Sequence, residues 1–269
     1  MHEPQYAFAD LALSRRLERC EASANAALIE ARARLSPQSG AAWIECAGAY
    51  AMFDGVGSPL TQTFGLGVFE TPKDADLDRI ETFFHEREAG VFHEVSPIAP
   101  PEVMQLLVTR GYQPVELTSV MHQPLKRSTL PTSEVKTRIA TDDESELWAE
   151  TAAKGWGETP ELTAFIRDLG RISADAEGVW SFIAELDGRA VGTGALVMHD
   201  GVALLAGAST IPEARNRGAQ RALLEARLHY AAEHGCDLAM MCAAPGSTSQ
   251  RNAERRGFRI AYTRIKWGK

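Results

Sequence analysis

Three arginines surround one glycine where an apolar run gives way to a predicted helix: Arg215, Arg217 and Arg221 around Gly218. The first amides of a helix have no intrahelical acceptor and lie at the positive end of its dipole, so they bind anions. A glycine there lets the anion approach the backbone. The pattern therefore predicts a turn that binds a diphosphate. The alternative, a loop glycine among solvated arginines, is disfavoured by the flanking strand and helix.

The elements that must position this turn are a strand at 202–210 and a helix at 216–234. Two other phosphate-binding motifs do not account for it. The chain has no G-x-x-x-x-G-K-[ST] segment here, and the three glycines of the Rossmann fingerprint are missing.

The overall charge excludes several classes of partner. The chain of 269 residues has a formal net charge of −8 and an isoelectric point near 5.5, so we expect neither a nucleic acid nor an anionic membrane surface as partner. A neutral or cationic small molecule fits better. The four cysteines form no C-x-x-C pair and have no histidine at zinc-ligand spacing, which predicts reduced thiols and no metal. We expect a cytoplasmic protein, because neither a secretory signal nor an apolar run of about 18 residues is evident.

The two halves of the chain show a similar order of predicted elements. In the second half these are a strand at 135–140, helices at 142–154 and 161–169, a hairpin at 179–186 and 190–199 turning at Asp187-Gly188, and then 202–210, 216–234, 238–243, 247–256 and 258–266. In the first half they are a long helix at 13–35, strands at 43–53 and 61–69, a helix at 74–88, a strand at 91–95, a helix after 100–102 and a strand at 112–122. The polar segment 123–136 separates them. Chance similarity is the alternative to duplication.

The fold class predicted is therefore α/β, with two tandem domains at 1–125 and 135–269. Each is expected to have a mixed, mostly antiparallel sheet flanked by helices. The first domain presents the carboxylates of Glu70, Asp74 and Asp76 where an anion would bind, so it should not hold a diphosphate. Its long helix could mediate dimerisation, and we expect a monomer or a homodimer.

Residues 135–269 resemble the GCN5-related N-acetyltransferase (GNAT) superfamily on two motifs. Thr210 to Gln220 looks like the strand exit and the Q/R-x-x-G-x-G/A acetyl-CoA turn of that family, and Ser247 to Phe258 resembles a later segment that ends in Gly-Phe. The resemblance implies a degenerate first domain and an acetyl-CoA-dependent N-acyltransferase. Acetyl-CoA would be the acyl donor, and the amine of a small substrate would attack it directly in a ternary complex. The residues implied to bind acetyl-CoA are Ala208, Ser209, Thr210, Arg215, Asn216, Arg217, Gly218, Ala219, Gln220, Arg221, Ser249 and Asn252.

The sequence departs from the family pattern at three positions. Gln220 stands where the family prefers Gly or Ala, Gly246 stands where asparagine is usual, and Ala253 replaces the tyrosine that protonates the departing thiolate. A thiol has a pKa of about 8.5, so a thiolate can leave without obligatory protonation. Ser249 is the residue we expect to donate the proton instead.

The base that deprotonates the amine is less well defined. Glu185 is the candidate we favour as catalytic base, with Glu158, His199 or a chain of ordered waters as alternatives. Trp156 lies in the loop that shapes the acceptor site in the family, so it is a candidate for substrate binding, although simple packing would also explain it. The missing tyrosine and the lack of an obvious base leave a second function open, a non-catalytic acyl-CoA sensor or scaffold.

Overall fold

The computed structural model describes residues 6–127, 129–130, 133–157 and 160–269. By its internal contacts the chain divides into two compact units. The first unit comprises the residues up to Pro124 together with Met240–Lys269, and the second comprises Leu125–Ala239. The chain therefore leaves the first unit after Pro124 and returns to it within strand β10 (Leu238–Ala243).

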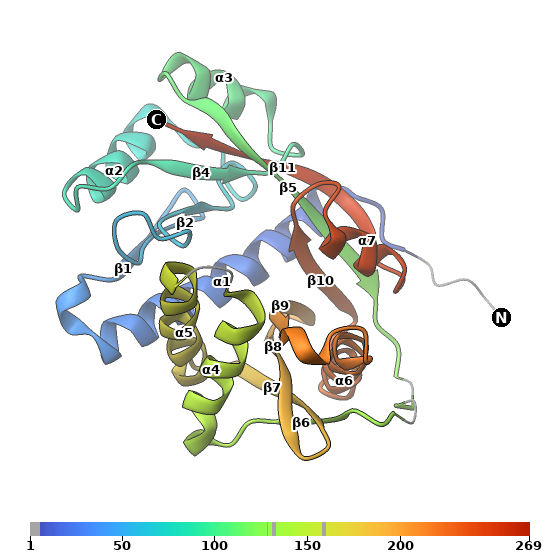
Figure 1. Cartoon of the computed structure of the whole chain (residues 1–269). Coiled ribbons are helices and arrows are strands. Elements are labelled where there is room, and N and C mark those ends of the chain that lie inside the picture. The colour runs from blue at the N-terminus through green and yellow to red at the C-terminus, as the bar shows by residue number, and fades with distance from the viewer. Residues whose placement is uncertain (1–5, 128, 131–132, 158–159) are drawn as a thin grey trace. The chain divides into compact units, whose positions relative to one another are not determined.

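The first unit is built on a mixed sheet (Figure 1). Its strands follow the order β1-β2-β3-β4-β11-β5, and neighbouring strands are antiparallel except β3 and β4. The elements are α1 (Leu11–Leu35), a short 3-10 turn (Pro37–Ser39), β1 (Ala42–Cys46), β2 (Ala49–Phe53), β3 (Gln62–Phe64), α2 (Asp74–His85), β4 (Phe92–Val95), α3 (Pro101–Thr109), β5 (Gln113–Pro124), α7 (Thr248–Glu254) and β11 (Arg259–Gly268).

Two apolar clusters attach the helices to this sheet. One cluster joins α2 and α3 to the strands through Leu77, Ile80, Phe84, Val103, Leu107, Val95 and Trp267. The other joins α1 to the strands through Ala22, Ala26, Ile29, Met52 and Phe64. Helix α1 is capped by Asp10, whose carboxylate accepts a hydrogen bond from the Leu13 amide, and it carries Arg32 and Arg34 in its last turn, as the helix dipole favours.

A buried charged group lies between α1 and the strands of the first unit. The Arg264 guanidinium donates to Glu18 at 3.2 Å, to Glu21 at 2.7 Å and to Glu94 at 2.9 Å. Tyr262 donates its hydroxyl hydrogen to Glu18 at 2.9 Å. Burial raises the pKa of Glu18 to about 7, against the opposing effect of Arg264. One cation therefore holds three carboxylates together, and Glu18 titrates near neutral pH.

The strands predicted early in the chain differ from those observed. The run at 43–53 is a hairpin and not one strand, because Ala47 and Gly48 adopt φ values of +49° and +71°. Left-handed conformations at both positions are what a two-residue type I′ turn requires. The run predicted at 61–69 is a strand only at Gln62–Phe64, since Gly65 and Gly67 both take φ of +77° and end it.

The second unit is an antiparallel sheet with the order β9-β8-β7-β6 (Figure 1). Its elements are β6 (Lys136–Ile139), a 3-10 turn (Asp142–Glu144), α4 (Ser145–Trp156), α5 (Pro160–Asp175), β7 (Val179–Leu186), β8 (Arg189–His199), β9 (Val202–Thr210), a second 3-10 turn (Pro212–Ala214) and α6 (Ala219–Glu233). The hairpin predicted at Asp187-Gly188 is confirmed, with φ of +53° and +74°. Trp148 and Ala152 of α4 pack on Ile183 and Ala195 of the sheet.

The fold class is the predicted one, α/β with mostly antiparallel strands flanked by helices. The first crossing between the units falls beside the polar segment 123–136. The second crossing, in β10, is not evident from the sequence. It arises because β11 pairs antiparallel with both β4 and β5 of the first unit, and chain order does not reveal a strand's partners.

Within the described part of the chain, no helix has the length and apolar character needed to cross a bilayer. Nor do those residues contain a group of three or more His, Cys, Asp or Glu side chains placed to hold a metal ion.

Candidate functional site

The predicted anion-binding turn lies at the exposed start of α6. Asn216 and Gly218 take left-handed φ values of +63° and +90°, and α6 begins at Ala219 with no side chain capping it. The first helical hydrogen bond runs from the Ala222 amide to the Gly218 carbonyl at 3.0 Å. The amides of residues 219–221 precede that bond, so they are the free donors of the helix start. A Cβ built on Gly218 would meet no atom within 4 Å, which leaves the approach to these amides open.

The three arginines of the turn are exposed and have weak or local partners. Arg215 donates to the carbonyl oxygen of Gly155 at 3.2 Å, and Arg217 lies 3.7 Å from Asp187 at the β7–β8 turn. Arg221 pairs with Glu225 one turn along α6 at 2.8 Å. Surface pairs of this kind contribute about 0–1 kcal/mol. The guanidinium groups can therefore turn to a bound anion at little cost.

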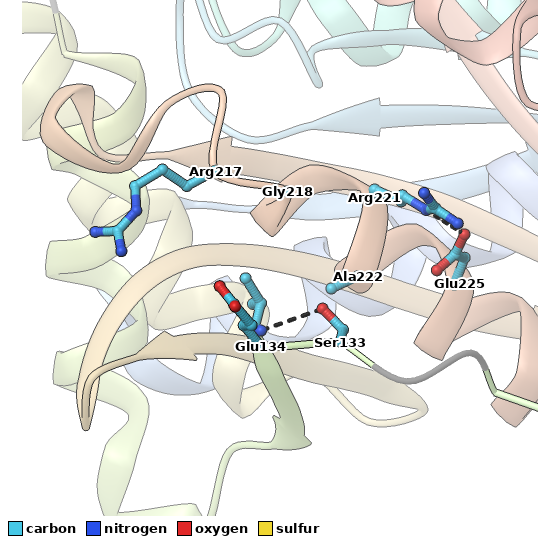
Figure 2. Close-up of a pocket in the computed structure, with 8 residues that line it drawn as sticks. Ser133, Glu134, Arg217, Gly218, Arg221, Ala222 and Glu225 are labelled. Atoms are coloured by element: carbon cyan, nitrogen blue, oxygen red, sulfur yellow. Dashed lines mark hydrogen bonds and ion pairs between the residues drawn. The ribbon is translucent and has the colours of Figure 1, made fainter.

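A cavity of ≈ 260 Å³ borders the start of α6 (Figure 2). Its lining residues come from α6 with its preceding turn and from the segment before β6: Arg217, Gly218, Arg221, Ala222 and Glu225, with Ser133, Glu134 and Val135. In the view of Figure 2, Gly218 and Ala222 lie above Ser133 and Glu134, and the Arg221 side chain points to Glu225. The volume is below the roughly 300–1,000 Å³ of complete ligand sites. It would therefore hold part of a ligand.

Gln220, the departure from the family turn, connects the helix start to the end of β9. Its side-chain amide donates to the Thr210 hydroxyl at 2.8 Å. The neighbouring Ser209 hydroxyl is 2.9 Å from that of Thr193 on β8. The side chains of Thr210 and Ser209 are thus engaged within the unit. What these two residues can offer a ligand is their backbone.

A β-bulge interrupts β9 just before these residues. The register pairs Thr193 with Ser209 but Ala195 with Ala206, so Gly207 and Ala208 both lie opposite Gly194. Gly207 has φ of +60°. The bulge interrupts the regular ladder at these residues, which makes their backbone groups candidates for binding a ligand.

The end of α4 packs on the end of β9. A Cβ on Gly155 would lie 2.7 Å from the Cβ of Ser209 and 2.9 Å from the Thr210 amide nitrogen, so only glycine allows this approach. Trp156 follows directly and is 48% exposed. Trp156 is therefore half exposed at the end of α4 that packs on the β9 exit, and its role in substrate binding remains a prediction. Glu158 lies outside the described residues.

Glu185 has a partner that sequence spacing does not reveal. Arg138 on β6 donates to Glu185 at 2.9 Å, and the same guanidinium holds both oxygens of Glu144. This pair occupies the Glu185 carboxylate. A base at Glu185 would have to break the pair first.

His199 lies at the wrong end of its strand for proton transfer at the turn. It pairs with Val202, whereas Thr210 pairs with Gly192 at the other end of the ladder. The nine residues of β9, Val202 to Thr210, span roughly 27 Å over the steps between them, at about 3.4 Å per step. That distance separates His199 from the β9 exit.

Ser249 and Asn252 lie on α7, in the first unit and not with the turn. Both are exposed. The helix is capped by Ser247, whose hydroxyl accepts the Gln250 amide, and Ala253 is buried beneath it. Their roles as proton donor and cofactor contact remain predictions.

In the first unit, the helix start that corresponds to this turn is the start of α2, and carboxylates already lie there. At the start of α2, the Asp76 carboxylate accepts the Lys73 amide at 2.8 Å, and Asp74 lies in the same first turn. Carboxylates at this position satisfy the helix dipole and repel an anion. The absence of a diphosphate site from the first unit remains a prediction.

Residues 142–258 match the model of the acetyltransferase (GNAT) family. A GCN5-related N-acetyltransferase from Kribbella flavida is 19% identical, with 90% of this chain and 95% of that chain covered and a TM-score of 0.64. A GCN5-related N-acetyltransferase from Sphaerobacter thermophilus is 17% identical, with 82% and 76% covered and a TM-score of 0.55. A tandem GNAT protein from the clavulanic acid biosynthesis pathway is 12% identical, with 82% and 78% covered and a TM-score of 0.58.

The sequence matches none of the curated proteins with which it was compared. The structural likenesses are at low identity and show a shared fold. The family match is specific to residues 142–258, which include the turn at Gly218. Residues 142–258 therefore match the acetyltransferase (GNAT) family, and the chain shares its fold with GNAT proteins, a tandem one among them.

Proposed function

We propose that the protein is an acetyl-CoA-dependent N-acyltransferase that transfers an acetyl group to the amine of a small substrate. The observation that carries the proposal is the open start of α6, with free amides, a left-handed Gly218 and three exposed arginines, inside a GNAT-family domain. The net charge of −8 favours an acceptor that is neutral or cationic.

The residues at this site fit the diphosphate of CoA. The amides of Ala219, Gln220 and Arg221 would donate to it, and Arg215 and Arg217 would add charge. Gly218 leaves the space that a Cβ would fill. The backbone of Ala208, Ser209 and Thr210 would hold the pantetheine arm, since their strand is interrupted by the bulge. Asn216, Ser249 and Asn252 are further proposed contacts.

The reaction proposed is a direct transfer. The amine nitrogen forms a bond to the thioester carbonyl carbon, the carbonyl electron pair moves to oxygen, and its return expels the thiolate as the C–S bond breaks. The thiolate needs little help to leave, because a thiol has a pKa of about 8.5. Ser249 is the proposed donor to it. For the amine proton, ordered waters are better suited than Glu185, which Arg138 already holds.

The acceptor would bind beside Trp156. Its ring is exposed at the end of α4, and Gly155 holds that end against Ser209 and Thr210. An exposed tryptophan offers apolar contact and, to a cationic amine, a cation–π contact worth about 0.5–1 kcal/mol. This placement supports a small amine as acceptor.

The test is to incubate the purified protein with acetyl-CoA and a panel of polyamines, amino acids, aminoglycosides and peptides, while following free thiol and product mass. We expect amine-dependent thiol release with one acetylated product per thiol. Tight CoA binding without thiol release for any acceptor would instead support the acyl-CoA sensor.

A further inference from the structure

Arg227 on α6 is a cation buried in the second unit. Its side chain is only 3% exposed. Its Nη1 donates to the carbonyl oxygens of Ala195 at 3.0 Å and Ala206 at 3.1 Å, and its Nε donates to the Leu223 carbonyl at 3.1 Å. The guanidinium thus connects β8, β9 and α6 through backbone oxygens.

The position of this guanidinium coincides with the bulge of β9. Ala195 and Ala206 are the last paired residues before Gly207 and Ala208 leave the ladder. Gly194, opposite the bulge, makes room for the cation: a Cβ there would lie 2.8 Å from the Arg227 Cζ. Gly194 on β8, the bulge on β9 and Arg227 on α6 therefore pack against one another.

The charge of this arginine is costly to bury. Burial lowers the pKa of Arg227 to about 10, so the group is still charged at neutral pH. Its hydrogen bonds to backbone oxygens offset part of that cost, and their loss would leave buried acceptors without a donor. The guanidinium therefore holds the backbone in place where the bulge of β9 begins.

We propose that Arg227 is a positioning residue for acetyl transfer, which fixes the β9 bulge for the thioester carbonyl and stabilises the charge that develops on its oxygen. The inference rests on the proposed function. When the amine nitrogen attacks, the carbonyl electron pair moves to oxygen, and it returns as the C–S bond breaks and the thiolate leaves. A cation in the protein interior, where the dielectric constant is low, stabilises a nearby negative oxygen more strongly than a cation in water does. The guanidinium acts on this oxygen through the bulge and its field.

The first test replaces the guanidinium and separates binding from turnover. For Arg227→Met we expect the Kd for CoA, measured by calorimetry, to stay within about threefold, since the turn at Gly218 is untouched. We expect kcat to fall on the order of 10- to 100-fold, below the 10²–10³ of a direct oxyanion donor. The melting temperature should fall by a few degrees, because the carbonyl oxygens of Ala195 and Ala206 lose a buried donor. Arg227→Lys, which keeps the charge, should recover part of kcat.

A second pair of variants controls for packing. Gly194→Ala pushes the guanidinium from its place and should lower kcat while CoA still binds. Gly170→Ala makes a similar overlap elsewhere in the unit, with a Cβ 2.9 Å from the Ala149 Cα. It should lower the melting temperature and leave kcat within about twofold. A merely structural Arg227 would lower kcat, CoA affinity and melting temperature together.

A binding readout distinguishes failure of this inference from failure of the proposed function. Wild-type protein should bind acetyl-CoA more tightly than CoA. In Arg227→Met the ratio of the Kd for CoA to the Kd for acetyl-CoA should be close to one. If the wild type releases no thiol with any amine, the proposed function fails, and the ratio still decides the role of Arg227. An unchanged ratio, or an unchanged kcat in a folded Arg227→Met protein, overturns the inference.

Discussion

The start of α6 allows a matched comparison of two glycines on one helix. Gly218 precedes α6 and Gly235 follows it, with φ of +90° and +89°, and a Cβ on either meets no atom within 4 Å. Leucine at a left-handed position costs about 1–2 kcal/mol of strain. Each Leu variant should therefore remain folded and melt roughly 2–8 °C lower, at about 2–4 °C per kcal/mol for a protein of this size.

Only the Gly218→Leu variant should lose CoA. Its side chain enters the space in front of the free amides, and losing two hydrogen bonds to a charged acceptor at about 1.5 kcal/mol each amounts to about 3 kcal/mol, or roughly 100-fold in Kd. Gly235→Leu is the control, with the same strain and no contact with the turn. Calorimetric titration with CoA gives both constants. Equal Kd values for the two variants would refute the placement of the cofactor at α6.

Two further results are expected. The raised pKa of Glu18 means that the folded state binds this proton more tightly than the unfolded state, so stability should fall as pH rises from about 4.5 to about 7. Glu18→Gln should make the melting temperature depend less on pH over that range. The same pH dependence in variant and wild type would contradict the assignment. Glu185→Gln should keep at least half of kcat and the same pH profile because Arg138 already holds the carboxylate, whereas a 100-fold loss of kcat would identify Glu185 as the base.

Features fixed by local chemistry could be predicted from the sequence. Asp187-Gly188 specifies a two-residue hairpin through its own backbone preferences, and the structure has that hairpin. The glycine at the start of α6 was predicted from its position between a strand and a helix, and glycine adopts the left-handed conformation seen at Gly218 without a steric cost. The Ala47-Gly48 hairpin was not predicted, because alanine seldom adopts a left-handed conformation.

Features that depend on distant partners could not be predicted. The pairing of β11 with β4 and β5 joins residues far apart in the chain. Arg227 looks like one more charged residue on a helix, and only the structure shows it buried at the bulge. The Gly192-x-Gly194 spacing on β8 was the one available indication that α6 approaches closely there, since a Cβ on Gly192 would lie 3.3 Å from Leu223. The pairing of Glu185 with Arg138 could not be predicted either, because the two residues are 47 positions apart in the chain.

The central claim is that CoA is held at the start of α6 and not at the start of α2. Hydrogen–deuterium exchange with and without saturating CoA tests it within one sample. We expect slower exchange in peptides that cover residues 215–222 and no change in those that cover 73–79, where Asp76 already caps the helix. Unchanged exchange at 215–222, or protection at 73–79 instead, would contradict the account.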